Sequence, residues 1–249
     1  MIILKDRREL QLMRESGKIA AGAIEKASQV IKPGVTTYAV DKALREFIES
    51  QGATPSFLGL YGFPGSACIS VNDELIHGIP SKTKIINEGD IVSVDIGALW
   101  KGYHSDTAYT FAAGEISENA KRLLEATQEC LRRGIEQAVV GNMIADISKA
   151  VEEYATTQGY SVVREYEGHG VGRKLHEEPS VPNFVTGRSG PRLLNGMTIA
   201  IEPMINEGSA KINVLDDDWT VVTADGKLCA HFEHTVAITN DGPEILTKL

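Results

Sequence analysis

The stretch GDIVSVDIGALWKGYHSDTAYTF, residues 89–111, has the residue pattern of two β-strands but carries acidic groups inside them. Residues 91–98 are largely apolar, and a second strand pattern begins at Tyr103, after the Lys-Gly turn signal in LWKG. Asp95 lies in the middle of the first run, although Asp is depleted in strands and a carboxylate buried without a partner is costly. The stretch therefore predicts a β-hairpin with a compensating group near Asp95.

Asp106 on the second strand is a candidate partner for Asp95. A turn centred near Trp100 and Lys101 places the two carboxylates directly opposite each other, whereas a turn one residue longer changes the register. Opposed carboxylates repel each other unless they share a proton or a cation. The hairpin therefore indicates a pair of acidic groups that binds one or the other.

The chain also contains an internal repeat. Residues 34–53 and 141–160 both begin with Gly, both contain Lys-Ala and both end close to a Gln-Gly pair. The offset is 107 residues (34 to 141), and the same offset carries Asp95 onto Glu202 in the apolar run TIAIEPMI. Two unrelated helix–strand units are the alternative to a true repeat. We interpret the pattern as related halves that meet around a shared site.

The predicted organisation is a single domain, residues 1–249, with halves of about 1–110 and 111–249. Apolar positions at a spacing of three or four predict helices over 7–31, 37–51, 117–139 and 143–158. Strand patterns cover 66–72, 91–98, 103–111, 197–206, 219–223 and 228–239. Because helices precede strands in each half, the order favours an α+β fold over a doubly wound parallel sheet.

The second half repeats the placement of acidic groups in strands. Glu202 lies within an apolar strand, and Glu233 lies on the strand that follows an Asp-Gly turn at 225–226. An edge-strand carboxylate that faces water is the alternative for each group taken alone. A pair from each half is more simply explained by a common site, whereas the loop run 216–218 is interpreted as solvated.

The six histidines divide into two groups. His104, His231 and His234 lie in strand patterns, where a histidine is more often structural than catalytic. His169 and His176 lie in EGHGVGRKLHEEP, whose glycines allow a ligand to approach the backbone closely, and His77 precedes a glycine in a turn-prone segment. One imidazole with four carboxylates suits a pair of divalent ions such as Mn, Fe, Co or Zn. Such ions would offset the free-energy cost of burying the Asp95 carboxylate.

Composition excludes several other classes. The chain is 42% hydrophobic, and its N-terminus MIILKDRREL fits neither a signal peptide nor a transit peptide. No run reaches the ~18 apolar residues of a membrane span. Three scattered cysteines are typical of reduced thiols in a cytoplasm, and a net charge of −9 argues against nucleic-acid binding. We therefore expect a cytoplasmic protein that contacts neither DNA nor membrane.

Seven motifs, in order, resemble those of the type I methionine aminopeptidases: HGIP (77–80), VDIG (94–97), YHSDTA (103–108), GHGVG (168–172), LHEEP (175–179), IEPM (201–204) and FEHT (232–235). The resemblance covers essentially the whole chain. It implies the α+β pita-bread fold, in which pseudo-twofold-related halves of antiparallel strands are covered by helices. This agrees with the repeat found from the residues alone.

The resemblance also implies a metal-dependent aminopeptidase that removes the initiator methionine from peptides and nascent chains, preferentially before a small second residue. The resemblance implies two divalent ions (Co, Mn, Fe, Zn or Ni), and a hydroxide held between them would attack the scissile carbonyl. The implied metal ligands are Asp95, Asp106, His169, Glu202 and Glu233, with Asp106 and Glu233 shared by both ions. Glu202 would also handle the proton of the attacking water.

His77 and His176 are implied to act on the substrate, His77 at the amide and His176 at the scissile carbonyl. Candidates for the methionine pocket are Phe57, Phe63, Cys68 and Trp219, and ordinary core packing is the alternative for the aromatic residues. Leu60 and Leu175 stand where many relatives have an aromatic ring, so the shape of the pocket differs from theirs. We expect a monomer, and any transient contact with the ribosome would use the domain surface.

Three other interpretations compete with this one. An Xaa-Pro aminopeptidase or prolidase would use the same ligands, but such relatives usually carry a large N-terminal domain, and here the first repeat begins within the first dozen residues. A metal-free binding protein on the same scaffold would have lost ligand positions that are intact here. A type II enzyme would need an insertion, yet His176 and Glu202 are only 26 residues apart.

Overall fold

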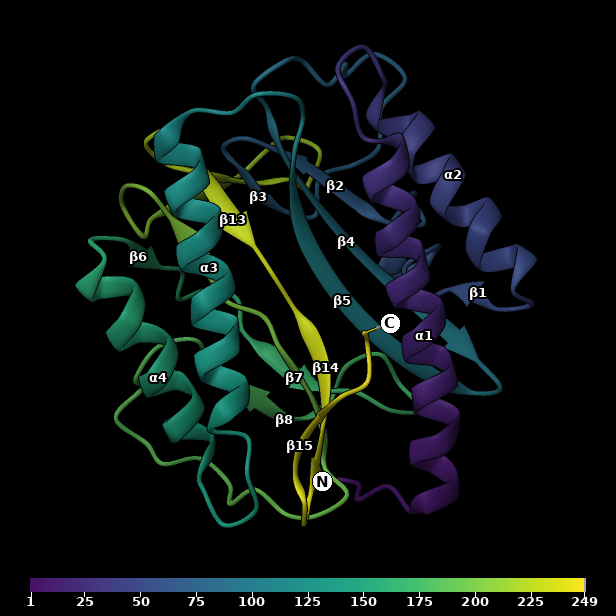
Figure 1. Ribbon diagram of the computed structural model, residues 1–249, viewed down its shortest axis with the longest axis vertical. Helices are drawn as coiled ribbons and strands as arrows, with labels where there is room; N and C mark the ends of the chain where they lie inside the picture. Colours follow the sequence, from purple (N-terminus) through teal and green to yellow (C-terminus); the bar gives the residue numbers. More distant parts are fainter. Residues whose placement is uncertain (249) are drawn as a thin grey trace.

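The computed structural model describes residues 1–248 and contains the mixture of helices and antiparallel strands that the sequence predicts. The helices are α1 (Arg7–Val30), α2 (Thr37–Ser50), α3 (Glu118–Glu136) and α4 (Ile144–Thr157), with a short 3-10 turn η1 (Leu60–Gly62). Figure 1 shows α1 and α2 over one half and α3 and α4 over the other, with the strands behind them. The α+β prediction is confirmed.

The strands of the first half are β1 (Thr54–Pro55), β2 (Cys68–Val71), β3 (Glu74–Ile76), β4 (Ile91–Trp100) and β5 (Tyr103–Ala112). Those of the second half are β6 (Ser161–Val162), β7 (Gly168–Gly170), β8 (Glu177–Val181), β9 (Thr198–Ile201), β10 (Met204–Asn206), β11 (Ile212–Val214), β12 (Val221–Thr223), β13 (Cys229–His231), β14 (His234–Thr239) and β15 (Gly242–Ile245). The two largest sheets, β1-β4-β2 with β5 beside β4 and β15-β14-β9-β7-β8, contain Asp95, Asp106 and His169, and β9 and β14 end next to Glu202 and Glu233.

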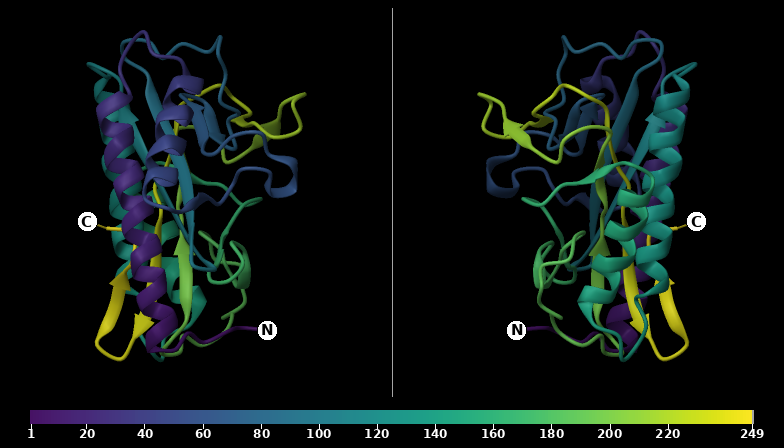
Figure 2. Two further views of the ribbon diagram at one scale, coloured as in Figure 1. Left: turned by 90° about the vertical axis from the view of Figure 1, so that its right-hand side faces the viewer. Right: turned by 90° about the vertical axis from the view of Figure 1, so that its left-hand side faces the viewer.

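The molecule has a helical face and a loop face. In the side views of Figure 2 the helices run along one side of the strands, and the loop around residues 57–63 and the β11–β12 segment project from the other. Buried apolar residues between the helices and the strands form a separate core cluster in each half. No helix within residues 1–248 has both the length and the apolar character needed to cross a membrane.

Helix α1 shows how local sequence sets an element. The Asp6 side chain accepts a hydrogen bond from the Glu9 backbone N–H (2.8 Å), and the Glu9 carboxylate accepts one from the Asp6 N–H (3.0 Å). This capping box satisfies donors that the first helical turn leaves free. Met13, Ala20 and Ala27 are spaced seven residues apart and are completely buried, so they form the face through which the helix packs on the strands.

Gly17 lies on the buried face of α1, against the carbonyl of Leu246. A Cβ added at Gly17 would lie 2.1 Å from the Leu246 carbonyl oxygen. We therefore expect Gly17→Ala to lower the free energy of unfolding by roughly 1–3 kcal/mol, since the helix must move away from the C-terminal segment. Urea denaturation measures the loss. Gln29→Ala, on the exposed face of the same helix, is the control, and equal stability of the two variants would contradict this packing.

The 107-residue offset recurs in the backbone. Isolated β-bridges join Thr36 to Ile85 in the first half and Met143 to Arg192 in the second, and each residue of one bridge is 107 positions from its counterpart. Glycines with positive φ show the same relation: Gly34, Gly52 and Gly89 (φ 90°, 74° and 91°) correspond to Gly141, Gly159 and Gly196 (φ 99°, 83° and 90°). The same turns thus connect the same kinds of element. The boundary near residue 110 stays a prediction.

The β4–β5 hairpin differs from its predicted register. Asp95 pairs with Ala108 and Asp106 with Gly97, because the turn residues are Lys101 and Gly102 (φ 47° and 85°) rather than Trp100 and Lys101. The prediction that Asp95 and Asp106 are directly opposed is therefore wrong. The difference moves the strand partner by two positions, and side chains alternate with a period of two, so both carboxylates still share one face as diagonal neighbours.

The predicted strand over 197–206 is interrupted at Glu202 and Pro203, which separate β9 from β10. Proline lacks the N–H that a continuous ladder requires. The partner strand is interrupted at Phe232 and Glu233, and the register on either side of the gap is the same, with Ile201 paired to His234 and Met204 to His231. Glu202 and Glu233 therefore face each other across this gap.

The two halves are joined along β5 and β14. The Glu233 backbone N–H donates to the Ala108 carbonyl (2.9 Å), and the Asp106 N–H donates to Thr235 Oγ1 (2.9 Å). The Thr107 hydroxyl donates to the Glu233 carbonyl (2.8 Å). We call this set of bonds the β5–β14 seam. It brings the acidic residues of the first half next to those of the second.

Candidate metal centre

A cavity of about 470 Å³ opens on the loop face beside the β5–β14 seam. Its walls include every residue predicted for metal binding, catalysis or substrate binding: Phe57, Phe63, Cys68, His77, Asp95, Asp106, His169, His176, Glu202, Trp219 and Glu233. Strands β4 and β5 supply Asp95 and Asp106, β7 supplies His169, and the gaps beside β9 and β14 supply Glu202 and Glu233. Residues distant in sequence are thus brought to one cavity.

The predicted ligands form overlapping groups of donor atoms. Asp95, Asp106 and Glu233 place one oxygen each within 4.8 Å of one another, and so do donor atoms of His169, Glu202 and Glu233. Glu233 belongs to both groups. His169 Nε2 also lies 3.6 Å from Asp106 Oδ2 and from Glu202 Oε1, which connects the groups from the other side.

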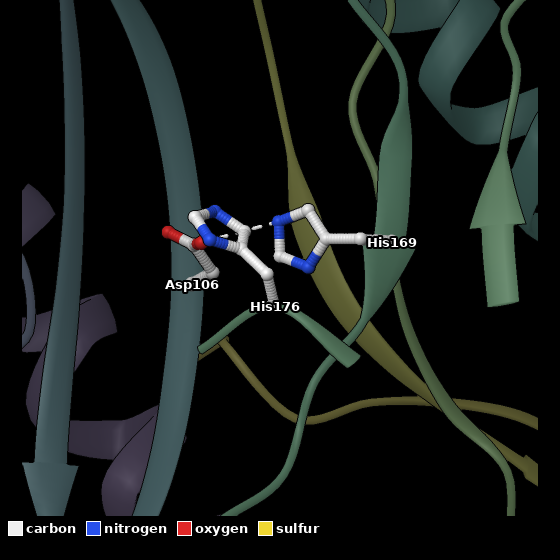
Figure 3. Close-up of side chains that lie close together, drawn as sticks. All are labelled: Asp106, His169 and His176. Carbon is white, nitrogen blue, oxygen red and sulfur yellow. Dashed lines mark ion pairs between the residues drawn. The ribbon is translucent and has the colours of Figure 1, made fainter. Parts of the chain in front are cut away.

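The orientation of His169 leaves one ring nitrogen free to bind a ligand. Its Nδ1–H donates to the carbonyl of Gly170 (2.9 Å), so the lone pair is on Nε2, the atom that faces Asp106 and Glu202. Such a hydrogen bond to the remote nitrogen is typical of metal-binding histidines. Figure 3 shows His169 and Asp106 approaching from different strands, with His176 beside them.

Without a bound cation, burial disfavours the ionised form of the four carboxyl groups. It raises the pKa of Asp95 to about 7 and that of Glu202 to about 8, and it raises the pKa values of Asp106 and Glu233 well above the usual range. Asp95 Oδ1, Asp106 Oδ1 and Glu233 Oε1 are buried and accept no hydrogen bond within residues 1–248. Buried oxygens without partners, grouped within ligand distance, fit divalent cations.

Burial also favours metal binding by His169, because it keeps the imidazole neutral. Burial is the largest of the effects that lower its pKa to about 4, so the ring is neutral and Nε2 keeps its lone pair. A neutral imidazole beside carboxylates binds metal without first releasing a proton. The chemistry of the donor set therefore agrees with the spacing of the atoms.

His176 and His77 both line the cavity that contains the carboxylates. His176 precedes β8, is exposed to the cavity, and meets the ring of His169 edge to face at 4.4 Å between centroids. It also belongs to a third donor group, with Asp106 and His169. The ring of Tyr61 stacks against that of His176, with centroids 6.2 Å apart. His176 can thus contact both a ligand of the cavity and the neighbouring donor atoms.

His77 follows β3 and has a backbone φ of 59°, a conformation that non-glycine residues rarely adopt. Its ring meets Tyr166 edge to face at 5.5 Å, and burial is the main cause that lowers its pKa to about 4. The next residue has no room for a side chain, because a Cβ on Gly78 would lie 2.4 Å from the Ile69 carbonyl oxygen. The chain is therefore constrained to present a neutral imidazole to the cavity.

One end of the cavity is apolar. Phe57, Phe63, Cys68 and Leu175 are buried together, and Leu60, Ile79 and Trp219 pack against them. The Phe63 and Trp219 rings meet edge to face at 5.1 Å. Leu60 and Leu175, singled out as aliphatic replacements, both line this apolar end.

Several cavity or neighbouring residues were not predicted. Tyr61, Ile76, Tyr166 and Glu167 also line the cavity. His231, considered structural from its strand pattern, is buried with Nε2 3.5 Å from Glu202 Oε2, and burial lowers its pKa. A spacing of two residues between His231 and Glu233 is the signal that could have revealed it, since such residues share one face of a strand.

Related halves that surround a cavity with carboxylates and an imidazole define a metallohydrolase of the pita-bread class. The sequence model of metallopeptidase family M24 matches residues 11–240. The chain is 53% identical to the methionine aminopeptidase of Clostridium perfringens (strain 13 / Type A), over 100% of both chains. It therefore belongs to the methionine aminopeptidases of family M24, which confirms the predicted resemblance, and this membership implies that the site binds divalent metal.

Solved structures agree with this assignment. A methionine aminopeptidase from Thermotoga maritima superposes with a TM-score of 0.98 at 44% identity, and each chain covers 100% of the other. A prolidase from Pyrococcus furiosus superposes with a TM-score of 0.82 at 27% identity, over 99% of this chain but 66% of the prolidase. The prolidases are therefore more distant relatives on the same fold.

Proposed function

We propose that this protein is a metal-dependent aminopeptidase that removes N-terminal methionine from peptides and nascent chains. The single observation that carries the proposal is the position of the metal-type donor groups at one end of a cavity whose other end is apolar. A free α-amino group can reach the donor end while an unbranched thioether side chain enters the apolar end. The names of the relatives support the same activity.

The proposed site holds two divalent ions. Asp95, Asp106 and Glu233 would hold one, and His169, Glu202 and Glu233 the other, with Asp106 also shared because His169 Nε2 lies near it. Two doubly charged cations balance four carboxylates in charge. Carboxylate oxygens with one imidazole suit Co, Mn, Fe, Zn or Ni.

Different side chains would have different roles in cleavage of the scissile bond. Bound divalent ions supply Lewis acidity and lower the pKa of water so that it can act as a nucleophile near neutral pH. Glu202, whose carboxylate lies among the donor atoms, would take a proton from the attacking water and pass it to the leaving amine. His176, exposed to the cavity, would donate to the oxygen that becomes negative as the carbonyl is attacked.

The remaining cavity residues select the substrate. His77 would contact the substrate amide from its constrained position, and Phe57, Phe63, Cys68 and Trp219 would surround the methionine side chain. Aliphatic Leu60 and Leu175 pack well against a flexible thioether. We expect a preference for small second residues, because the ring of Tyr166 crowds the cavity next to His77.

A peptide panel tests this function. With Mn(II) or Co(II) added, we expect cleavage of Met-Ala-Ser at least 100-fold faster, in kcat/KM, than cleavage of Ala-Pro or Leu-Pro peptides, because the apolar end receives the first side chain. Met-Ala-Ser should also exceed Met-Leu-Ser. Release of the first residue is measured by mass spectrometry. Faster cleavage of the Xaa-Pro peptides would favour the prolidase alternative, and no cleavage with any metal would contradict the proposal.

The cellular setting follows from the same proposal. Cys68, Cys130 and Cys229 are buried free thiols, which is compatible with the cytoplasmic location expected for an enzyme of nascent chains. A monomeric state and a transient contact with the ribosome stay predictions.

A further inference from the structure

His231 is a buried imidazole next to the proposed metal centre that the mechanism above does not use. It ends β13 with 1% of its surface exposed, and Nε2 lies 3.5 Å from Glu202 Oε2. Neither ring nitrogen has a hydrogen-bond partner elsewhere in the described chain. A buried polar ring without partners is costly, so its position next to Glu202 calls for an explanation.

The backbone of His231 is fixed in place. Its N–H donates to Thr110 Oγ1 (3.0 Å), and the Thr110 hydroxyl donates back to the His231 carbonyl (2.8 Å). On the other side, His231 pairs with Met204, two residues beyond Glu202 on the interrupted strand. The ring is therefore held behind Glu202 by the first half through Thr110 and by the second half through Met204.

The His231 ring lies next to the proposed metal ligands but is not one of them. His231 is absent from the residues that line the cavity and from the donor groups of residues 1–248, whereas Glu202 belongs to both. Its nearest carboxylate oxygen, Glu202 Oε2, is the one that does not face His169, because His169 Nε2 approaches Oε1. One carboxylate thus has an imidazole on each oxygen.

From this arrangement we propose that His231 is a positioning residue, whose Nε2–H donates to Glu202 Oε2 and fixes the orientation of that carboxylate. A neutral imidazole has one N–H, so it can donate to Oε2 without cancelling the charge that a cation needs. A shift of a few tenths of an ångström brings 3.5 Å to a normal hydrogen-bond length. The inference rests on the metal site of the proposed function, in which Glu202 binds metal and handles a proton.

Two substitutions separate positioning from packing. His231→Leu keeps a side chain of similar volume but removes the donor, whereas His231→Gln keeps an N–H donor. We expect His231→Leu to weaken Mn(II) binding by 10- to 100-fold in calorimetric titration and to lower kcat by a similar factor, with KM changed less than threefold. His231→Gln should recover both quantities to within about threefold of the unaltered chain.

A measurement on the unaltered chain does not depend on the variants folding. In ¹⁵N-histidine NMR spectra of the zinc-loaded protein, we expect the His231 ring to be the Nε2–H tautomer. An Nδ1–H tautomer would overturn the proposal, and so would wild-type Mn(II) affinity in folded His231→Leu. Equal losses in the Leu and Gln variants would likewise count against it, since they would indicate packing alone.

Failure of this inference is distinguishable from failure of the proposed function. If the unaltered chain binds no divalent metal, the proposed metal site itself is wrong, and the inference about His231 is wrong with it. If the unaltered chain binds Mn(II) and cleaves Met-Ala-Ser while His231→Leu does both equally well, only the role of His231 is excluded.

Discussion

Glu202→Ala is expected to lower kcat/KM for Met-Ala-Ser by about 10⁴-fold, since the substitution removes both a metal ligand and the proposed proton carrier. Glu202 lies within one donor group, 3.6 Å from His169 Nε2, and faces Glu233 across the β9–β10 gap. The fold should remain, because the loss of one of several buried like-charged groups relieves repulsion in the metal-free protein. Steady-state kinetics with Mn(II) and circular dichroism measure the two expectations.

Two further variants make the Glu202 result specific. Asp106→Ala should give a comparable loss, because Asp106 contributes to the donor groups from the first half. Glu167→Gln is the matched control: it removes a carboxylate that lines the same cavity but belongs to no donor group within residues 1–248. Near-normal turnover in the Glu202 or Asp106 variant would refute the mechanism, as would an equal loss in the Glu167 variant.

His176→Ala is expected to lower kcat by about 10²- to 10³-fold while the protein still binds two metal ions, because the substitution removes a donor to the developing oxyanion. The position of His176 also allows a second role. His176 lies within ligand distance of Asp106 and His169, so a direct metal bond is the competing role. Elemental analysis of the purified variant, alongside its kinetics, distinguishes the two roles.

Tyr61→Ala is the control for His176. Its ring stacks against that of His176 and the residue is 77% exposed, so its removal should change kcat by less than about tenfold. Loss of one metal ion in His176→Ala would assign that residue as a ligand and overturn its role at the carbonyl. Unchanged kcat with full metal content would show that His176 contributes nothing to the reaction.

Much of the fold could be predicted because its signals are local. The helices begin at capping residues such as Asp6, Thr36 and Ser117, and their apolar spacing marks the buried face. The acidic residues within strands were recognisable because the cost of burying a carboxylate does not depend on the details of the fold. These signals located the carboxylates of the candidate site and, with the glycine-rich segment, His169.

Other features depend on contacts that no local pattern contains. The register of the β4–β5 hairpin was wrong because Lys101 adopts a positive φ that the sequence alone does not require. The role suggested for His231 depends on the gap that Pro203 introduces and on a bond to Thr110, more than a hundred residues away. Short strands such as β7 and β8 are defined by their pairing with each other and with β9, which the local sequence does not encode.

The β5–β14 seam has a consequence for how the protein assembles. The carboxylates come in equal numbers from two separately packed cores, so neither part of the chain alone presents a complete ligand set. An ion that binds only the docked arrangement favours docking by mass action, and its concentration enters directly into the unfolding equilibrium. Metal availability during synthesis would then govern the yield of native enzyme as well as its turnover.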